Sequence, residues 1–102
     1  MVARVTHYQI RAGKIEEFVA TVESLTAAMD TLTGFRSLVV LRGEDPTSRE
    51  AMAISVWESE ADMRDSDSNT HYYHVVSKLI GCCESFSPMH VREVLASKFA
   101  NP

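Results

Sequence analysis

The sequence contains little cysteine, proline or glycine. Its 102 residues include two cysteines, three prolines and four glycines. Cys82 and Cys83 are adjacent, so a disulfide between them would need strained geometry, and two thiols alone do not complete a zinc site. We interpret them as small buried apolar groups, with a redox switch as the alternative.

Long hydrophobic runs and clusters of positive charge are also missing. No apolar run approaches the ~18–20 residues of a membrane span, and the first ten residues lack the apolar block of a signal peptide. The net charge is −4, and the ten basic residues are scattered along the chain. We therefore expect a cytoplasmic protein that binds neither nucleic acid nor membrane. A glycine-rich phosphate loop and a nucleophile elbow are absent as well, which argues against nucleotide binding and acyl transfer.

The chain does have a regular order of predicted elements. With 102 residues, which is the usual size of a single core, it is expected to form one domain over 1–102, with a core at about 2–96 and a tail at 97–102. Runs of β-branched and aromatic residues predict strands, and so does the extended segment after Pro88. A 3.6-residue apolar period predicts helices. The predicted strands are 2–10, 35–43, 51–58 and 89–96, and the predicted helices are 15–32, a short one after residue 59, and 70 to about 83.

Residues at the ends of these segments favour the same boundaries. Gly34 can adopt the left-handed conformation that ends a helix. Ser59 with Asp62 resembles a capping box, and Asn69 can cap the helix that follows it.

The predicted order is β-α-β-β-α-β, which is the ferredoxin-like α+β sandwich: a four-stranded antiparallel sheet with both long helices on one face. The second strand is apolar on both sides. Phe35, Val39 and Leu41 are assigned to one side, and Leu38 and Val40 to the other. Since helices can cover only one of these faces, we predict a homodimer that packs sheet against sheet.

Two segments, "IRAGKIEEFVATVESL" and "GFRSLVVLRGEDPTSREAMAISVWESEADM", resemble the antibiotic biosynthesis monooxygenase family of dimeric α+β barrels. The most specific features are the Gly34-Phe35 step and the run from Trp57 to Ala61. His71 also matches a histidine that many members have at the start of the second long helix. The resemblance implies homodimers with a pocket between helices and sheet. Some members oxidise polycyclic phenols to quinones with dioxygen and no metal or flavin, others degrade haem, and many have no known activity.

The haem-degrading branch is matched poorly. Those relatives resemble one another in an asparagine on the first strand, a second tryptophan and a histidine ligand on the long helix. Here Thr6 or His7 occupies the asparagine position, and Ser66 replaces the tryptophan that would contact the porphyrin. His71 and His74 remain as the candidate axial ligands.

The segment "NTHYYHVV" supplies the candidate catalytic residues. At 100° per residue, Tyr72 points inward and His71 lies at the edge of the apolar arc, while His74 faces solvent. In the first helical turn, the dipole favours a neutral His71 imidazole, which could accept a phenolic proton at a pocket rim. The alternative for His71 is a histidine at the helix start that bonds to a neighbouring backbone or side-chain group. The alternative for Tyr72 is a tyrosine that packs in the core. His71 and His74 lack a third ligand nearby, so no metal is predicted.

Thr6 and Tyr8 share one face of the first strand and become pocket walls if that face meets the helices. Trp57 either closes the pocket or fills the core. The favoured hypothesis is a cofactor-independent monooxygenase that oxidises a phenolic or quinol-type aromatic. In it, His71 is the base and Tyr72, Tyr8, Thr6 and Trp57 shape the site. The alternatives are a non-catalytic ligand-binding or interaction dimer and, with less support, haem binding or degradation.

Overall fold

The structure, a computed structural model, describes residues 1–87 and 90–98. The strands are β1 (Val2–Ile10), β2 (Phe35–Arg42), β3 (Glu50–Trp57), β4 (Cys83–Phe86) and β5 (His90–Glu93). The helices are α1 (Ile15–Met29), α2 (Glu60–Asp65), the 3₁₀ helix η1 (Ser66–Ser68) and α3 (Thr70–Gly81). None of the helices in this part of the chain has the length and apolar character that a membrane crossing requires.

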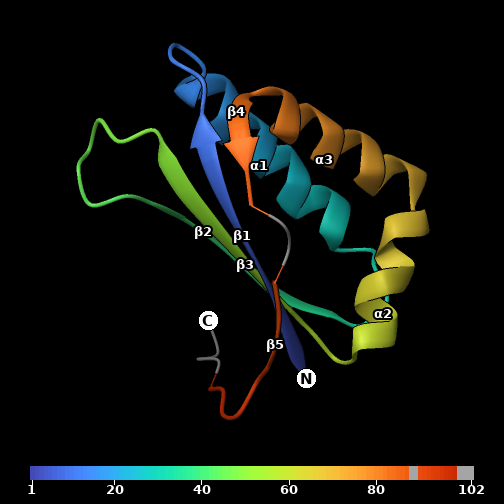
Figure 1. Cartoon of the computed structure of the whole chain (residues 1–102). Coiled ribbons are helices and arrows are strands. Elements are labelled where there is room, and N and C mark those ends of the chain that lie inside the picture. The colour runs from blue at the N-terminus through green and yellow to red at the C-terminus, as the bar shows by residue number, and fades with distance from the viewer. Residues whose placement is uncertain (88–89, 99–102) are drawn as a thin grey trace.

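All described strand pairs of the sheet are antiparallel. β3 lies between β2 and β1, and the other edge of β1 pairs with β4 near Ile10 and with β5 near Val2. Helices α1 and α3 lie side by side on one face of this sheet, and no described element covers the other face (Figure 1). The predicted ferredoxin-like α+β fold is therefore confirmed.

The edge beside β1 differs from the prediction in one respect. A single strand was predicted at 89–96, whereas two short strands, β4 and β5, share this edge. The helix before them ends at Gly81, so Cys83 begins β4 instead of ending α3. Residues 88–89, where the predicted strand begins, and 99–102 of the predicted tail lie outside the described residues.

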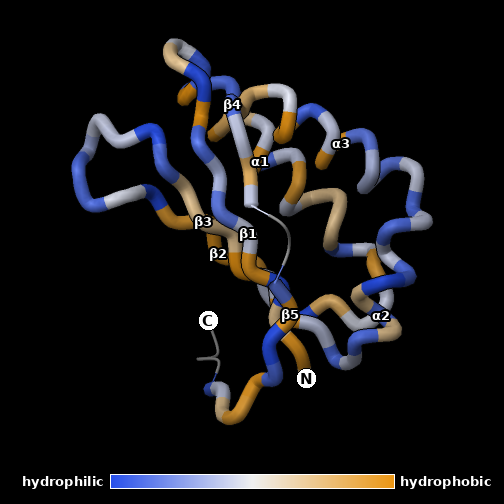
Figure 2. Tube along the Cα trace, in the orientation of Figure 1, coloured by the Kyte–Doolittle hydropathy of each residue, from blue (hydrophilic) through white to orange (hydrophobic). Residues whose placement is uncertain are grey.

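The hydrophobic core lies between the sheet and the two long helices. Trp57, Leu79 and Met29 are its most buried large side chains, with exposed fractions of 0%, 1% and 1%. Figure 2 shows that hydrophobic residues alternate with polar ones along α1 and α3 and are concentrated along β2 and β3. This alternation directs one side of each helix onto the sheet. Cys82 and Cys83 are free, buried thiols in the same core.

The two residues predicted to begin helices do so, but the predicted end of the first helix is wrong. Helix α1 ends at Met29 with Asp30 as its C-cap, and Gly34, with a φ of 77°, lies in the turn that leads into β2. The Ser59 hydroxyl accepts a hydrogen bond from the Asp62 backbone N–H at 3.1 Å, and the Asn69 side chain accepts one from the Tyr72 N–H at 2.9 Å. These bonds satisfy backbone donors that a helix start leaves without partners. The two caps fix where α2 and α3 start relative to β3.

Phe35 lies on the opposite face from the one predicted. An irregularity between Phe35 and Ser37 shifts the register of β2 against β3, so Phe35 pairs with Trp57 and their rings meet edge to face at 5.5 Å. The extra residue breaks the alternation of side chains along the strand. The prediction that Phe35 shares a face with Val39 and Leu41 is therefore wrong. Those two residues remain on the uncovered face and are 49% and 43% exposed.

Gly34 and Gly13 offer a matched test of the turn into β2. Both have positive φ, but a Cβ at Gly34 would lie 2.6 Å from the Asp62 Cβ, whereas no atom of the described residues lies within 4 Å of a Cβ at Gly13. Gly13→Ala should lower the free energy of unfolding by about 1–2 kcal/mol, the strain of a left-handed alanine. Gly34→Ala should lower it by about 3 kcal/mol or more, because steric overlap adds to that strain. Urea denaturation of both variants checks this, and equal losses would contradict it.

Candidate active site

A cavity of about 290 Å³ lies between the helix-covered face of the sheet and helices α1 and α3. This size is near the lower end of small-molecule pockets, and its wall is mostly apolar. Three of its polar residues, Arg4, Asp67 and Tyr72, lie together and define what we call its polar end. The polar side chains come from β1, β3, η1 and α3. The lining residues are Arg4, Thr6, Tyr8, Leu25, Met29, Leu38, Ala53, Ser55, Asp67, Tyr72, Tyr73, Val76 and Leu79.

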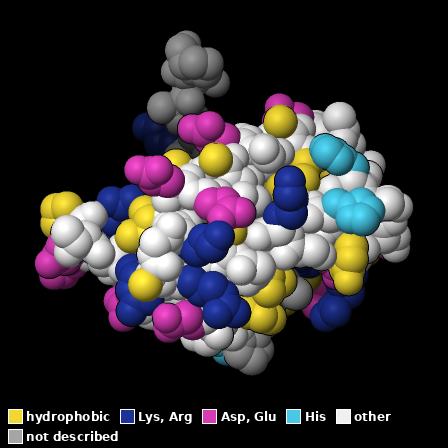
Figure 3. Space-filling view, turned by 90° about the horizontal axis from the view of Figure 1, so that it is seen from above, with side chains coloured by type: hydrophobic (Ala, Val, Ile, Leu, Met, Phe, Trp, Pro, Cys, Tyr) yellow, Lys and Arg dark blue, Asp and Glu magenta, His cyan; other side chains and the backbone are white. Residues whose placement is uncertain are grey.

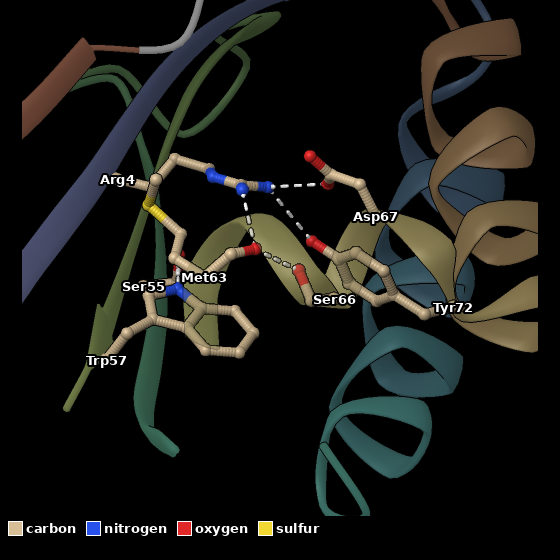
Figure 4. A network of polar contacts seen from close by, with 7 residues as sticks. All are labelled: Arg4, Ser55, Trp57, Met63, Ser66, Asp67 and Tyr72. Atoms are coloured by element: carbon tan, nitrogen blue, oxygen red, sulfur yellow. Dashed lines mark hydrogen bonds and ion pairs between the residues drawn. The ribbon is translucent and has the colours of Figure 1, made fainter. Parts of the chain in front are cut away.

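Arg4 is the buried cation of this cavity. Arg4 and Thr6 are two residues apart on β1, so their side chains lie on the same face of the sheet, the one that the helices cover. Arg4 is only 7% exposed. Its Nη2 donates a hydrogen bond to the Met63 carbonyl at 3.1 Å. Its Nη1 lies 3.4 Å from Asp67 Oδ1 and 3.5 Å from the Tyr72 hydroxyl (Figure 4). The buried Nε has no hydrogen-bond partner among the described residues.

These contacts leave the Arg4 charge only partly neutralised. Strong ion pairs place nitrogen and oxygen about 2.7–2.9 Å apart, and the 3.4 Å separation from Asp67 is longer. The Asp67 side chain is also 55% exposed, so water competes for it. In a low-dielectric site, a positive charge of this kind stabilises negative charge that develops on a bound molecule. The polar end of the cavity is therefore suited to a ligand oxygen.

Two tyrosines keep their protons beside this charge. Burial raises the pKa of Tyr8 to about 12, and the Thr6 hydroxyl beside it opposes this rise. Burial also raises the pKa of Tyr72, and the nearby Arg4 charge opposes that shift. Both hydroxyls therefore remain hydrogen-bond donors at neutral pH. Thr6, Tyr8 and Tyr72, which were predicted as site residues, are brought together in this cavity.

Trp57 lies behind the cavity wall and does not line it. It is fully buried, which places it in the core, one of the two alternatives for this residue. Its indole Nε1 donates a hydrogen bond at 2.9 Å to the hydroxyl of Ser55, which does line the cavity. Trp57 can therefore influence a ligand by orienting Ser55.

His71 is not at the rim of this cavity. It is exposed and lines a separate hollow between α1 and α3, together with Glu17, Thr21 and Lys78. The prediction of a pocket-rim position is wrong because that side of α3 meets α1 instead of the sheet. His74 is also exposed and absent from the cavity wall, and Figure 3 shows histidine side chains lying on the outer surface.

Metal ligands do not gather in the part of the chain that the structure describes. In residues 1–87 and 90–98, no group of three or more His, Cys, Asp or Glu side chains is arranged to hold an ion. The candidate haem ligands, His71 and His74, do not face the cavity either.

Four polar residues that line the cavity were not predicted as site residues: Arg4, Ser55, Asp67 and the exposed Tyr73. A signal for the first was present, because Arg4 shares the strand face of Thr6, Tyr8 and the core residue Ile10. An arginine on a core-facing strand position is rarely a solvated charge. Ser55 could have been found by the same alternation in β3, where it lies between the buried Ala53 and Trp57. Asp67 carries no comparable signal, because it lies in a polar segment.

The raised pKa of Tyr8 predicts a loss of stability at high pH. Between pH 10 and 12, Tyr8 ionises in the unfolded chain but keeps its proton in the folded protein. The unfolded state then binds fewer protons, so the free energy of unfolding should fall as pH rises, by up to about 2–3 kcal/mol. Tyr8→Phe should remove this part of the decrease and keep the ring contact with Phe18 at 5.7 Å. Denaturation at several pH values checks it.

Tyr73→Phe is the matched control, because Tyr73 is 61% exposed. If the stabilities of wild type and Tyr8→Phe differ by the same amount at pH 9 and pH 12, burial of Tyr8 does not govern its ionisation.

Several solved structures are similar to this fold. SnoaB, described as a cofactor-independent oxygenase from Streptomyces nogalater, is 17% identical, with 94% of each chain covered and a TM-score of 0.83. Rv0793 from Mycobacterium tuberculosis is 14% identical, with 98% of each chain covered and a TM-score of 0.71. A conserved protein from Methanosarcina mazei Go1 is 16% identical over 89% of this chain and 87% of its own, with a TM-score of 0.74.

At these identities the structural matches establish the fold alone, and no protein among the curated sequences matches this chain. The sequence itself matches the family model described as "Antibiotic biosynthesis monooxygenase" over residues 1–78, about three quarters of the chain. The chain therefore belongs to the antibiotic biosynthesis monooxygenase family.

Proposed function

We propose that the protein is a cofactor-independent monooxygenase that oxidises a phenolic or quinol-type aromatic with dioxygen. The observation that carries the proposal is the buried Arg4 guanidinium at the polar end of an otherwise apolar cavity. An aromatic ring fits the apolar wall, and its hydroxyl group reaches the charge. Family membership and the fold shared with SnoaB, described as a cofactor-independent oxygenase, support the same activity.

The chemistry needs an electron-rich ring. Arg4 stabilises the phenolate that forms when the substrate hydroxyl loses its proton, and this anion gives electrons to dioxygen. For a simple phenol, one oxygen atom becomes the second carbonyl of a quinone and the other leaves as water. The substrate supplies all four electrons, so the reaction balances without an external reductant.

Asp67 is the proton acceptor in this proposal. It is the sole carboxylate among the described residues that line the cavity, and its Oδ1 lies beside Arg4 Nη1. A general base must be within hydrogen-bond reach of the proton that it removes. Asp67 meets this condition for a hydroxyl bound at Arg4, whereas the predicted base, His71, lies outside the cavity.

The activity can be tested by oxygen uptake with a panel of naphthols and anthrols, in the presence of a chelator and without flavin. Their methyl ethers, which cannot form a phenolate, are the matched controls. We expect one dioxygen consumed per hydroxyaromatic, and one labelled oxygen atom in the product from ¹⁸O₂. A panel in which several compounds stabilise the fold against heat but none consumes oxygen would favour the ligand-binding alternative.

We also propose that two copies pack through the uncovered sheet face. Val39 is paired with Ile54, and Leu41 with Met52, which places all four on that face. Val39 and Leu41 are each more than two fifths exposed. A contiguous apolar sheet surface of this kind is typical of an interface, and no described helix covers it.

Val39→Asp tests this interface. A carboxylate on the apolar face should raise the dissociation constant of the dimer by about 100-fold or more, because burying an unpaired charge is costly. Val19→Asp is the control, since Val19 is 44% exposed on α1, on the helix side of the molecule. Sedimentation velocity measures both variants. A dimer that survives Val39→Asp unchanged would contradict the proposal.

A further inference from the structure

We infer that Arg4 and Asp67 together select an uncharged hydroxyl group, so the cavity prefers hydroxyaromatics over aromatic carboxylates and over ethers. This inference rests on the proposed function and specifies which ring substituents the site accepts. It concerns binding, so it can be tested separately from turnover.

The two charged groups are held from different parts of the chain. Arg4 lies on β1 and Asp67 on η1, and the Met63 carbonyl links them. This carbonyl accepts hydrogen bonds from Arg4 Nη2 and from the hydroxyl of Ser66, the residue before Asp67. Ser66 is 4% exposed, and its carbonyl accepts a further bond from the Asn69 N–H at 3.0 Å. The position of η1 beside Arg4 is therefore fixed by buried contacts.

The contacts at Arg4 Nη1 leave room for a ligand oxygen. Asp67 Oδ1 at 3.4 Å and the Tyr72 hydroxyl at 3.5 Å are both farther than the usual 2.9–3.0 Å of an N–H···O bond. Figure 4 shows the carboxylate and the phenol approaching the same nitrogen from two directions. A bound oxygen that accepts a bond from Nη1 would lie next to the carboxylate.

The charges of this pair decide which oxygen is accepted. Arg4 and Asp67 are the sole formally charged side chains among the described cavity residues, so the site carries no net charge. Arginine only donates hydrogen bonds and an ionised aspartate only accepts them. A hydroxyl group satisfies both partners, whereas an ether oxygen cannot donate to Asp67 and a carboxylate is repelled by it.

The other polar groups of the cavity do not provide this selection. The remaining polar side chains are hydroxyls, which can donate or accept hydrogen bonds by rotating their hydrogen atoms; they belong to Thr6, Tyr8, Ser55, Tyr72 and Tyr73. Their presence favours polar oxygen atoms in general. Discrimination between a neutral hydroxyl and an anion therefore depends on Asp67.

Three ligands with one ring system form the test: 2-naphthol, 2-methoxynaphthalene and 2-naphthoate. Titration calorimetry at neutral pH should show that the wild-type protein binds 2-naphthol about tenfold or more tightly than either analogue. Asp67→Asn should bind 2-naphthoate about tenfold more tightly than wild type does, because the repelling charge is gone and Arg4 remains. Asp67 is largely exposed, so this near-isosteric change should leave the fold intact.

Asp65→Asn is the matched control. Asp65 is exposed, two residues away, and does not line the cavity, so its variant should keep the wild-type order of affinities. Arg4→Met should lose 2-naphthoate binding and leave 2-methoxynaphthalene nearly unchanged.

Two results would overturn the inference. One is equal wild-type affinity for 2-naphthol and 2-methoxynaphthalene, and the other is unchanged 2-naphthoate affinity in Asp67→Asn. Selective binding without oxygen uptake would support the inference and contradict the oxygenase activity. Oxygen uptake with unselective binding would contradict the inference alone.

Discussion

Replacing Arg4 with methionine is expected to lower kcat/KM for a hydroxyaromatic by about 100-fold or more, the usual effect of removing one donor that stabilises a developing anion. The guanidinium is buried in the cavity, so water cannot take over its role at the same position. Oxygen uptake at several substrate concentrations measures the effect.

The fold should survive this change. After Arg4→Met, the Met63 carbonyl still accepts the Ser66 hydroxyl bond, and Asp67 is exposed enough to be hydrated. The change also removes the buried Arg4 Nε, which has no hydrogen-bond partner in the part of the chain that the structure describes. We therefore expect the free energy of unfolding to change by only about 1 kcal/mol.

Arg36→Met is the control for loss of a positive charge, because Arg36 forms an exposed ion pair with Glu58. Its activity should equal that of wild type. If Arg4→Met retained wild-type kcat/KM while folded, Arg4 would have no role in the reaction.

Replacing Trp57 with alanine should have the largest effect on stability, a loss of about 3–5 kcal/mol in the free energy of unfolding. The indole is fully buried, contacts Phe35 edge to face and donates a hydrogen bond to Ser55. Because small proteins are stable by only about 5–15 kcal/mol, much of the population would unfold on mild heating. Equilibrium denaturation in urea measures the loss.

Trp57→Phe separates packing from hydrogen bonding. It keeps an aromatic ring beside Phe35 and removes the N–H that Ser55 accepts, so the loss should be about 1–2 kcal/mol. If Trp57→Phe were as unstable as Trp57→Ala, the hydrogen bond and not the ring would dominate.

The fold could be predicted largely because local rules agreed with one another. The period of α1, the positive φ of Gly34 and the caps at Ser59 and Asn69 each depend on neighbouring residues, and the structure contains all of them. The errors arose where pairing between strands overrides local pattern. The irregularity beside Phe35 and the division of the last edge into β4 and β5 depend on contacts with β3 and β1.

The site could be predicted only in part. Thr6, Tyr8 and Tyr72 follow from the alternation of a strand and the apolar arc of a helix, and they line the cavity. His71 was misplaced because a helical projection shows which side is apolar but not which neighbour covers it. Arg4 was missed because a charge count treats every arginine as solvated. Its burial depends on residues more than 50 positions away, such as Met63 and Asp67.

The pairing of β4 and β5 with the same edge of β1 also affects how the chain folds during synthesis. Val2 pairs with Glu93 and Tyr8 with Phe86, so one edge of β1 stays open during synthesis until residues 83–93 have emerged from the ribosome. Pairings over such long sequence distances form slowly, and an unpaired edge can bind other chains. A nascent chain that stops before Cys83 would therefore expose the backbone of β1 to aggregation, even with both long helices complete.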